Sequence, residues 1–220
     1  AEDEEISKRL HFFLKKSGIK IKTGTGVTGY KKQDSKIVLQ LSDDSELTVD
    51  KVLLSVGRKP DLSVKYPPDL AVATGGSIEI DELMRTNIPG LYAIGDVTGK
   101  MPLAHTAAKQ GLIAVKDIKS KINGNTEAQY ELVYENIPRC TFTNPEVASV
   151  GLTERQASDR YGEIKVGRFP FTANGKAIAG GNVNGFVKVI VRAEDDILVG
   201  MHIIGPNAAE LIAQGSILIN

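Results

Sequence analysis

The sequence has one cysteine, three histidines, no tryptophan and no excess of either charge. The single cysteine, Cys140, excludes an internal disulfide and a metal site built from several cysteines, and the three histidines lack a metal-ligand spacing. The 27 basic and 27 acidic side chains give a formal net charge of +0 at pH 7, without a basic cluster that would bind nucleic acid. No apolar run is long enough to cross a bilayer, and the acidic first residues do not form a signal peptide. We therefore expect neither a nucleic-acid nor a membrane partner.

What the chain does contain is an ordinary globular composition. Hydrophobic residues make up 41% of it and charged residues 25%, so a sizeable core is possible. A length of 220 residues suffices for one large domain or two small ones.

The most informative stretch is 86–111, with the sequence TNIPGLYAIGDVTGKMPLAHTAAKQG. A turn leads into an apolar strand at 91–94, the Gly95-Asp96 pair, a loop and a helix that begins near Leu103. Gly95 lets the backbone approach a ligand closely, and the Asp96 carboxylate accepts hydrogen bonds from a polyhydroxy chain. The helix start offers N–H groups and a positive dipole end to an anionic ligand atom. An isolated Gly-Asp pair is more often a turn with a capping carboxylate, so both interpretations stay open at this level.

The whole stretch resembles the second flavin-binding segment of the pyridine nucleotide-disulfide oxidoreductases, and within them it is most similar to the dihydrolipoamide dehydrogenases. The matching words are 86–96 and 102–105. The resemblance implies that Asp96 binds the ribityl chain of FAD and that the following helix points at the pyrimidine side of the flavin ring. The residues it assigns to the flavin are Gly95, Asp96, Pro102, Leu103, Ala104 and His105. A helix N-terminus suits this place because reduced flavin is anionic near that edge.

One departure from the family precedes this helix. The family usually has Met directly before Leu-Ala-His, whereas this chain has Met101-Pro102. Proline is tolerated in the first turn of a helix, which is where we expect Pro102 to lie.

Residues 1–60 begin with a predicted helix over 2–17, whose apolar residues share one face. The strands expected after it are 19–22, 27–30, 36–41, 46–49 and 52–56. The turn between the third and fourth is predicted at Asp43-Asp44-Ser45. The last strand is an almost continuous apolar run, typical of a strand buried on both faces of a sheet.

This block resembles the second half of the family's NAD-binding domain, whose final strand ends in Gly-Arg-x-Pro, as here at 57–60. The resemblance implies that Val27 and Gly57 contact the nicotinamide nucleotide by close backbone approach. Without the resemblance, they would be a hairpin valine and a turn glycine. The strand and the Gly-x-Gly-x-x-Gly turn that begin this domain in the family are not in the sequence. The strands of 19–56 would therefore lack neighbours.

Residues 61–136 are expected to connect this block to the last domain. A short strand at 78–81 precedes the flavin segment, whose helix continues to about residue 122. A turn at 123–125 ends that helix, and residues 126–136 cross over to the next domain.

From residue 137 the sequence changes to short strands and turns. The expected strands are 140–142, 147–151, 164–170, 185–192 and 197–204. Thr153 and Gln156 have the spacing of a capping box at the start of a helix. A last helix is predicted to start at Asn207 and to be still continuing at Asn220.

Residues 137–220 resemble the interface domain of the same family. The matching words are 142–151, 169–177 and 200–206 with Ala209-Glu210. Asn144 stands where the family commonly has His. In the family this domain is buried against a second subunit, so the resemblance implies a homodimer through 137–220.

The groups that react with a dithiol in this family are not found. That chemistry needs a Cys-x4-Cys pair beside the flavin and a His-x4-Glu couple from the partner subunit. Cys140 is in neither motif, and we expect it to be a small buried residue. Of the histidines, we expect His11 on a helix surface, His202 as a satisfied structural residue in a strand, and His105 to line the flavin through its backbone. We thus assign no catalytic residue and no metal ligand.

The expected fold class is α/β and α+β, with partial dinucleotide-binding segments followed by an α+β interface domain. The expected domains are the second half of an NAD-binding domain at 1–60, a connector with the second FAD segment at 61–136, and an interface domain at 137–220.

By resemblance, the chain is a carboxyl-proximal part of an FAD-dependent enzyme that reoxidises protein-bound dihydrolipoamide and reduces NAD. Its hosts would be lipoyl-bearing 2-oxo acid dehydrogenase or glycine cleavage complexes, in the cytoplasm of a bacterium or the mitochondrial matrix of a eukaryote. The chain alone is expected to be inactive. The alternatives are a reductase of the mercuric or glutathione type and a non-catalytic dimerisation module.

Overall fold

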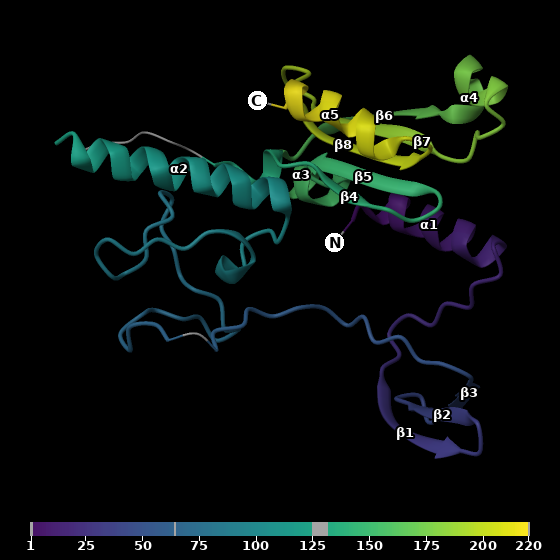
Figure 1. Cartoon of the computed structure of the whole chain (residues 1–220). Helices are drawn as coiled ribbons and strands as arrows, with labels where there is room; N and C mark the ends of the chain where they lie inside the picture. Colours follow the sequence, from purple (N-terminus) through teal and green to yellow (C-terminus); the bar gives the residue numbers. More distant parts are fainter. Residues whose placement is uncertain (1, 64, 125–131, 220) are drawn as a thin grey trace. The chain divides into compact units, whose positions relative to one another are not determined.

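The structure is a computed structural model that describes residues 2–63, 65–124 and 132–219 (Figure 1). It divides into two compact units, one formed by Leu14–Arg58 and the other by Ala1–Phe13 together with Lys59–Asn220. The crossover predicted at 126–136 lies partly outside the described residues, as does Asn220 at the end of the last helix.

The unit Leu14–Arg58 is built around a three-stranded antiparallel sheet. Its strands are β1 (Val27–Gln33), β2 (Lys36–Leu41) and β3 (Glu46–Val49), in the order β1-β2-β3. Asp44 adopts a left-handed conformation (φ 60°) in the turn between β2 and β3, so the turn predicted there is confirmed. Aspartate tolerates this conformation better than most residues.

Two strands predicted in this unit are wrong. Residues 19–22 and 52–56 are irregular, and Leu53 and Val56 are 91% and 85% exposed. A strand buried on both faces needs hydrogen-bonding neighbours on each side, and none of the described residues provides them. The apolar run at 52–56 therefore remains without a sheet to join.

The second unit contains a five-stranded antiparallel sheet with the order β4-β5-β8-β7-β6 (Figure 1). The strands are β4 (Arg139–Thr141), β5 (Glu146–Gly151), β6 (Ile164–Pro170), β7 (Phe186–Arg192) and β8 (Leu198–Gly205). All five predicted strands are found, within two residues at each end. The central strand, β8, is buried over most of its length because helices cover both faces of the sheet.

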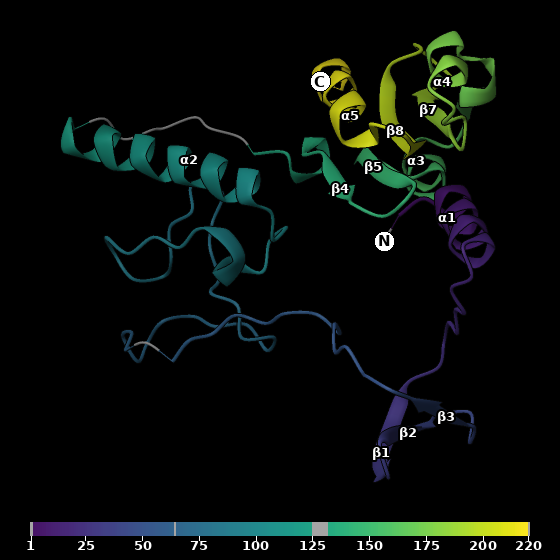
Figure 2. The ribbon, with the colours of Figure 1, turned by 45° about the vertical axis from the view of Figure 1, so that its right-hand side comes forward.

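One face of this sheet is covered by α5 (Ala208–Leu218), and the other by α1 (Glu4–Lys16), as Figures 1 and 2 show. The core under α5 consists of Ala148, Val150, Phe171, Ile203, Ala208, Ile212 and Ile219. On the opposite face, Ile6 and Phe13 of α1 pack against Val147 and Ile204. Alternate residues of each strand thus enter different cores, as the pleat requires.

The capping box predicted for α3 (Glu154–Tyr161) is confirmed, with Thr153 and Gln156 exchanging hydrogen bonds. The last helix ends at Leu218, earlier than predicted, because Ile219 leaves the helical conformation (φ −87°, ψ 105°). The sequence also did not predict four short helical segments: η1 (Gly95–Thr98), η2 (Tyr134–Asn136), η3 (Phe171–Ala173) and α4 (Gly175–Ala179).

The connector around α2 (Ala104–Ile122) contains little regular structure besides that helix. The strands predicted at 78–81 and 91–94 are each reduced to an isolated bridge, Val72 with Ile78 and Arg85 with Tyr92. A small apolar cluster of Met84, Ile113 and Ala114 holds α2 to this region instead.

The mixed α/β character with two sheets confirms the predicted fold class. Within the described residues, no helix is both long and apolar enough to cross a membrane.

Candidate functional site

Gly95 begins a turn that lies directly against α2. Its φ of +75° is a conformation that glycine adopts easily, and its N–H donates a hydrogen bond of 2.6 Å to Oε1 of Gln110. A Cβ at this position would lie 3.3 Å from the Cβ of Ala107, closer than most side-chain contacts. The predicted loop is thus a turn of 3-10 helix, in which Thr98 Oγ1 donates to the Gly95 carbonyl at 2.8 Å.

Asp96 follows in the same turn with its side chain exposed. Its backbone carbonyl accepts a hydrogen bond from the Gly99 N–H at 3.0 Å. Among the described residues, no donor is bonded to its carboxylate. The carboxylate can therefore accept hydrogen bonds from a ligand without first losing an internal partner.

The start of α2 presents backbone N–H groups in the same segment. Leu103 is its N-cap, in an extended conformation and without a side-chain capping bond. The Ala107 N–H is bonded to the Leu103 carbonyl at 3.0 Å, and the N–H groups of the first helical residues precede any intrahelical acceptor. Pro102 lies before the N-cap, so the expectation that it occupies the first helical turn is wrong. Met101, with φ 48°, turns the chain into the helix.

The side chain of His105 has a specific partner, which the sequence did not predict. His105 is exposed, and its Nε2 lies 2.8 Å from the carbonyl oxygen of Pro138. A carbonyl only accepts hydrogen bonds, so Nε2 carries the proton in this contact. The imidazole thus ties the start of α2 to the segment that enters β4.

Gln110 is a site residue that sequence reasoning missed. It is fully buried, accepts from the Gly95 N–H, and donates from Nε2 to the Tyr134 hydroxyl at 2.9 Å. The signal was available, because Gln110 falls on the apolar face of α2 between Thr106 and Ile113 at helical spacing. A buried amide on such a face requires polar partners.

Thr106 adds a second buried polar group to the first turn of α2. It is 1% exposed, and its Oγ1 has no hydrogen-bond partner among the described residues. Buried hydroxyl groups are almost always hydrogen-bonded. An unpaired hydroxyl close to an uncapped helix start fits a segment that receives a polar ligand.

An ion pair anchors α2 to the preceding connector. The Arg85 guanidinium donates to both oxygens of the buried Asp117 carboxylate, with Nε at 2.8 Å from Oδ2. The Tyr92 hydroxyl donates to the same Oδ2 at 2.5 Å. The hydrogen bonds from Arg85 outweigh burial and hold the pKa of Asp117 far below its usual value. Asp117 is therefore ionised, and it fixes the residues just before the Gly95 turn.

The predicted nucleotide contacts, Val27 and Gly57, lie in the other unit. Val27 is the first residue of β1 and is 60% exposed. Gly57 is exposed with φ 116°, and nothing lies within 4 Å of the position a Cβ would take. Both are surface backbone positions of the unit Leu14–Arg58, while Gly95 to His105 form one continuous segment in the second unit.

The remaining candidate groups are Cys140, His11 and His202. Cys140 is half-buried, and burial raises the pKa of its thiol, which disfavours the reactive thiolate. His11 is exposed on α1, as predicted. His202 is only partly satisfied, because Nε2 donates to the Leu152 carbonyl at 2.9 Å while Nδ1 is buried without a partner. The described residues contain no cluster of His, Cys, Asp or Glu able to hold a metal ion.

Two family models match this chain. The family model "Pyridine nucleotide-disulphide oxidoreductase" matches residues 1–111, and the model of that family's dimerisation domain matches residues 137–220. The chain therefore belongs to the pyridine nucleotide-disulphide oxidoreductase family.

Within this family, the chain is similar to curated dihydrolipoyl dehydrogenases. The chain is 42% identical to the dihydrolipoyl dehydrogenase of Corynebacterium glutamicum, over 96% of this chain and 46% of that protein. It is 39% identical to the mitochondrial dihydrolipoyl dehydrogenase of Pisum sativum, over 99% of this chain and 43% of that protein. The chain thus spans about half the length of the curated relatives it matches.

Two solved structures share the fold. The crystal structure of LpdA from Mycobacterium tuberculosis superposes with a TM-score of 0.85 at 23% identity, covering 100% of this chain and 47% of that one. The flavoprotein disulfide reductase RclA of Escherichia coli gives a TM-score of 0.85 at 22% identity, covering 99% of this chain and 49% of that one.

Proposed function

We propose that this chain supplies the second FAD segment, part of the NAD site and the dimerisation domain of a dihydrolipoyl dehydrogenase. The parent reaction is the reoxidation of protein-bound dihydrolipoamide with reduction of NAD, in a 2-oxo acid dehydrogenase or glycine cleavage complex. The domains are 1–60 for NAD, 61–136 for the connector and FAD segment, and 137–220 for homodimer formation. The matching family models and the dihydrolipoyl dehydrogenase relatives support this proposal.

The observation that carries the flavin assignment is the exposed Asp96 carboxylate next to the uncapped start of α2. A ribityl chain offers hydroxyl donors, and an ionised carboxylate is a strong acceptor for them. The N–H groups of Ala104 and His105, with Pro102 and Leu103 leading into them, suit the anionic edge of a reduced flavin. Gly95 holds this turn against α2.

FAD, when bound, supplies the electron transfer between the dithiol and NAD. The residues of this chain bind and orient it. Asp96 holds the hydroxyl chain, and the start of α2 stabilises negative charge on the ring. Val27 and Gly57 are the proposed contacts for the nicotinamide nucleotide. We assign no dithiol chemistry to Cys140, the single cysteine.

A titration with FAD tests this proposal. We expect weak binding, seen as quenching of flavin fluorescence, because the sequence has no glycine-rich turn for the diphosphate. Asp96→Ala should weaken it about 10-fold or more, as expected for lost charge-assisted hydrogen bonds. Asp159→Ala removes an exposed aspartate of α3 and is the matched control. Equal affinities for both variants, or no binding by the unmodified chain, would contradict the flavin assignment.

A further inference from the structure

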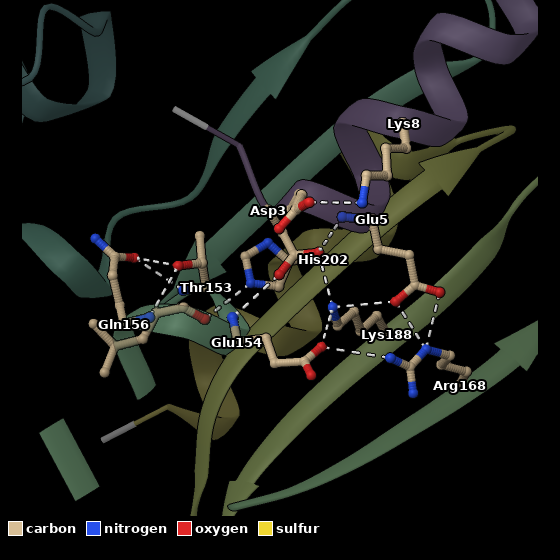
Figure 3. A network of polar contacts seen from close by, with 11 residues as sticks. Asp3, Glu5, Lys8, Thr153, Glu154, Gln156, Arg168, Lys188 and His202 are labelled. Carbon is tan, nitrogen blue, oxygen red and sulfur yellow. Dashed lines mark hydrogen bonds and ion pairs between the residues drawn. The ribbon is translucent and has the colours of Figure 1, made fainter. Parts of the chain in front are cut away.

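A row of buried polar side chains crosses the five-stranded sheet on the face that α1 covers, and Figure 3 shows two of its members, Lys188 and His202. The row consists of Ser149 on β5, His202 on β8 and Lys188 on β7, which are direct cross-strand neighbours. Each is at most 1% exposed. Such a row in the middle of a sheet is costly unless each member finds a partner.

The partners come from the first residues of the chain. Lys188 Nζ donates to Oδ1 of Asp3 at 2.8 Å, and Ser149 Oγ donates to Oε2 of Glu2 at 2.7 Å. Asp3 is itself only 2% exposed. The ammonium group also contacts two further carboxylates. Lys188 Nζ lies 3.2 Å from Oε2 of Glu5 and 2.6 Å from Oε2 of Glu154.

Asp3 also joins two helices. Its Oδ1 accepts from the Glu5 N–H in the first turn of α1, and its Oδ2 accepts from the Glu154 N–H at the start of α3, both at 3.1 Å. One carboxylate therefore binds the sheet through Lys188 and the N-terminal ends of both helices. It can do all three only when α1 lies in this position on the sheet.

Both groups are charged in this arrangement. Burial opposes the charge on each, but the hydrogen bond from Lys188 and the Glu154 N–H lower the pKa of Asp3, and the bonds to Asp3, Glu154 and Glu5 raise the pKa of Lys188. Removing Lys188 leaves the buried Asp3 carboxylate without a cation, which is strongly destabilising. Removing Asp3 leaves the Lys188 ammonium with only Glu5 and Glu154, whose side chains are partly exposed. An exposed pair such as Lys8 with Glu4 has no such effect.

The two sides of this contact belong to different family segments. Asp3 and α1 lie in the region 1–111 that matches the oxidoreductase model, and Lys188 lies in the dimerisation domain at 137–220. We propose that Asp3 and Lys188 form an inter-segment latch, in which Lys188 is the positioning residue that holds α1 on the dimerisation domain. The chain continues from α1 into the unit Leu14–Arg58.

The apolar contacts of α1 define its position on the sheet less strictly than the hydrogen bonds of Asp3 do. Ile6 and Phe13 pack on Val147 and Ile204 by a non-directional interaction. The bonds of Asp3 are directional, and a shift of α1 by one turn would break all of them while leaving Lys188 buried. The latch therefore selects one position for α1.

Hydrogen exchange of the 220-residue chain, followed by mass spectrometry, tests the latch without any cofactor. The result of this experiment therefore does not depend on whether the proposed flavin and NAD binding is correct. In Asp3→Asn the side chain keeps one capping oxygen for the first turn of α1, since Asn caps as well as Asp. It loses the charge and the second acceptor oxygen, to which the Glu154 N–H donates. In Lys188→Met the ammonium is replaced by an apolar group. We expect amide protection in α1 to fall at least about 10-fold in both variants, while β5 and β8 keep theirs.

Two controls define the outcome. Glu4→Gln removes the exposed pair with Lys8 and should leave α1 protection unchanged. The double variant Asp3→Asn/Lys188→Met should lose no more α1 protection than the single variants, because they remove the same interaction. The proposal is overturned if α1 protection survives in both single variants. It is also overturned if β5 and β8 lose protection with α1 in Asp3→Asn, or if the two losses add.

Discussion

At the scale of single residues, two aspartates of similar sequence position have different surroundings. Asp96 is exposed and unpaired among the described residues, which suits a ligand contact. Asp117, by contrast, is buried and bonded to Arg85 and Tyr92. Both are aspartates near the flavin segment in the sequence, and only their surroundings separate a binding role from a structural one.

His202 makes stability depend on pH. Burial lowers the pKa of His202 below its ordinary value of 6.5; the bond to the Leu152 carbonyl and the carboxylates of Asp3 and Glu2 oppose this, while Lys188 adds to it. Below about pH 6.5 the unfolded chain binds a proton that the folded chain does not, so the free energy of unfolding falls as pH decreases. Its slope from this residue is at most about 1.4 kcal/mol per pH unit.

Urea unfolding at pH 5, 6 and 7 measures this dependence. His202→Gln should reduce the slope, because the titrating group is gone. His11→Gln removes an exposed histidine and is the control. An unchanged slope in His202→Gln would show that His202 does not titrate differently in the folded and unfolded states.

At the scale of elements, helix ends carry much of the specificity of this fold. The α3 helix is capped by Thr153, whose Oγ1 accepts from the Gln156 N–H at 3.3 Å, while Gln156 Oε1 accepts from the Thr153 N–H at 3.0 Å. The α2 helix has no side-chain cap, and its first turn is where we place the flavin. A side-chain cap satisfies the first backbone N–H groups of a helix and stabilises the fold. Without a cap, those N–H groups can donate hydrogen bonds to a ligand.

Thr153→Ala should lower the free energy of unfolding by about 1 kcal/mol, the usual effect of losing an N-cap. Thr153→Ser keeps the hydroxyl and should retain most of the stability. Urea midpoints of the two variants provide the comparison. If the alanine and serine variants unfold at the same midpoint, the capping box does not stabilise α3.

At the scale of the whole molecule, the chain combines a sheet covered on both faces with an apolar run that belongs to no sheet among the described residues. The five-stranded sheet has a core on each face. The apolar run at 52–56 has no sheet to join among the described residues, and Leu53, Leu54 and Val56 are largely exposed. The five-stranded sheet thus has both faces covered, whereas the run at 52–56 has the sequence of a strand that needs neighbours.

The cysteine count predicts the outcome of an enzyme assay. With dihydrolipoamide and NAD, the isolated chain should show no turnover, since dithiol exchange needs a cysteine pair and the sequence has one cysteine. NADH absorbance measures this, and a full-length dihydrolipoyl dehydrogenase is the positive control. Turnover above the rate without protein would contradict the assignment of no catalytic residue.

Local patterns predicted much of this fold. The five strands of the larger sheet, the α3 capping box and the start of α2 within one residue all follow from apolar periodicity and capping chemistry, which act between residues close in sequence. The predictions at 19–22 and 52–56 failed because a strand is stabilised by partners that a local pattern does not contain. The Pro138 contact of His105 was missed for a related reason, since the two residues lie 33 positions apart. The helical spacing of Gln110 indicated its burial, but its partner Gly95 lies 15 positions away.

The sequence by itself determined the family, the order of the segments and the residues proposed for FAD and NAD, because short motifs record which backbone and side-chain groups meet a ligand. Only the tertiary structure decided where the charged residues of the chain's start lie. Asp3 looks in sequence like one more acid in an exposed helix turn. Folding places it in the core beside Lys188, 185 residues away in sequence. Low exposure to water strengthens the interaction between the two charges there.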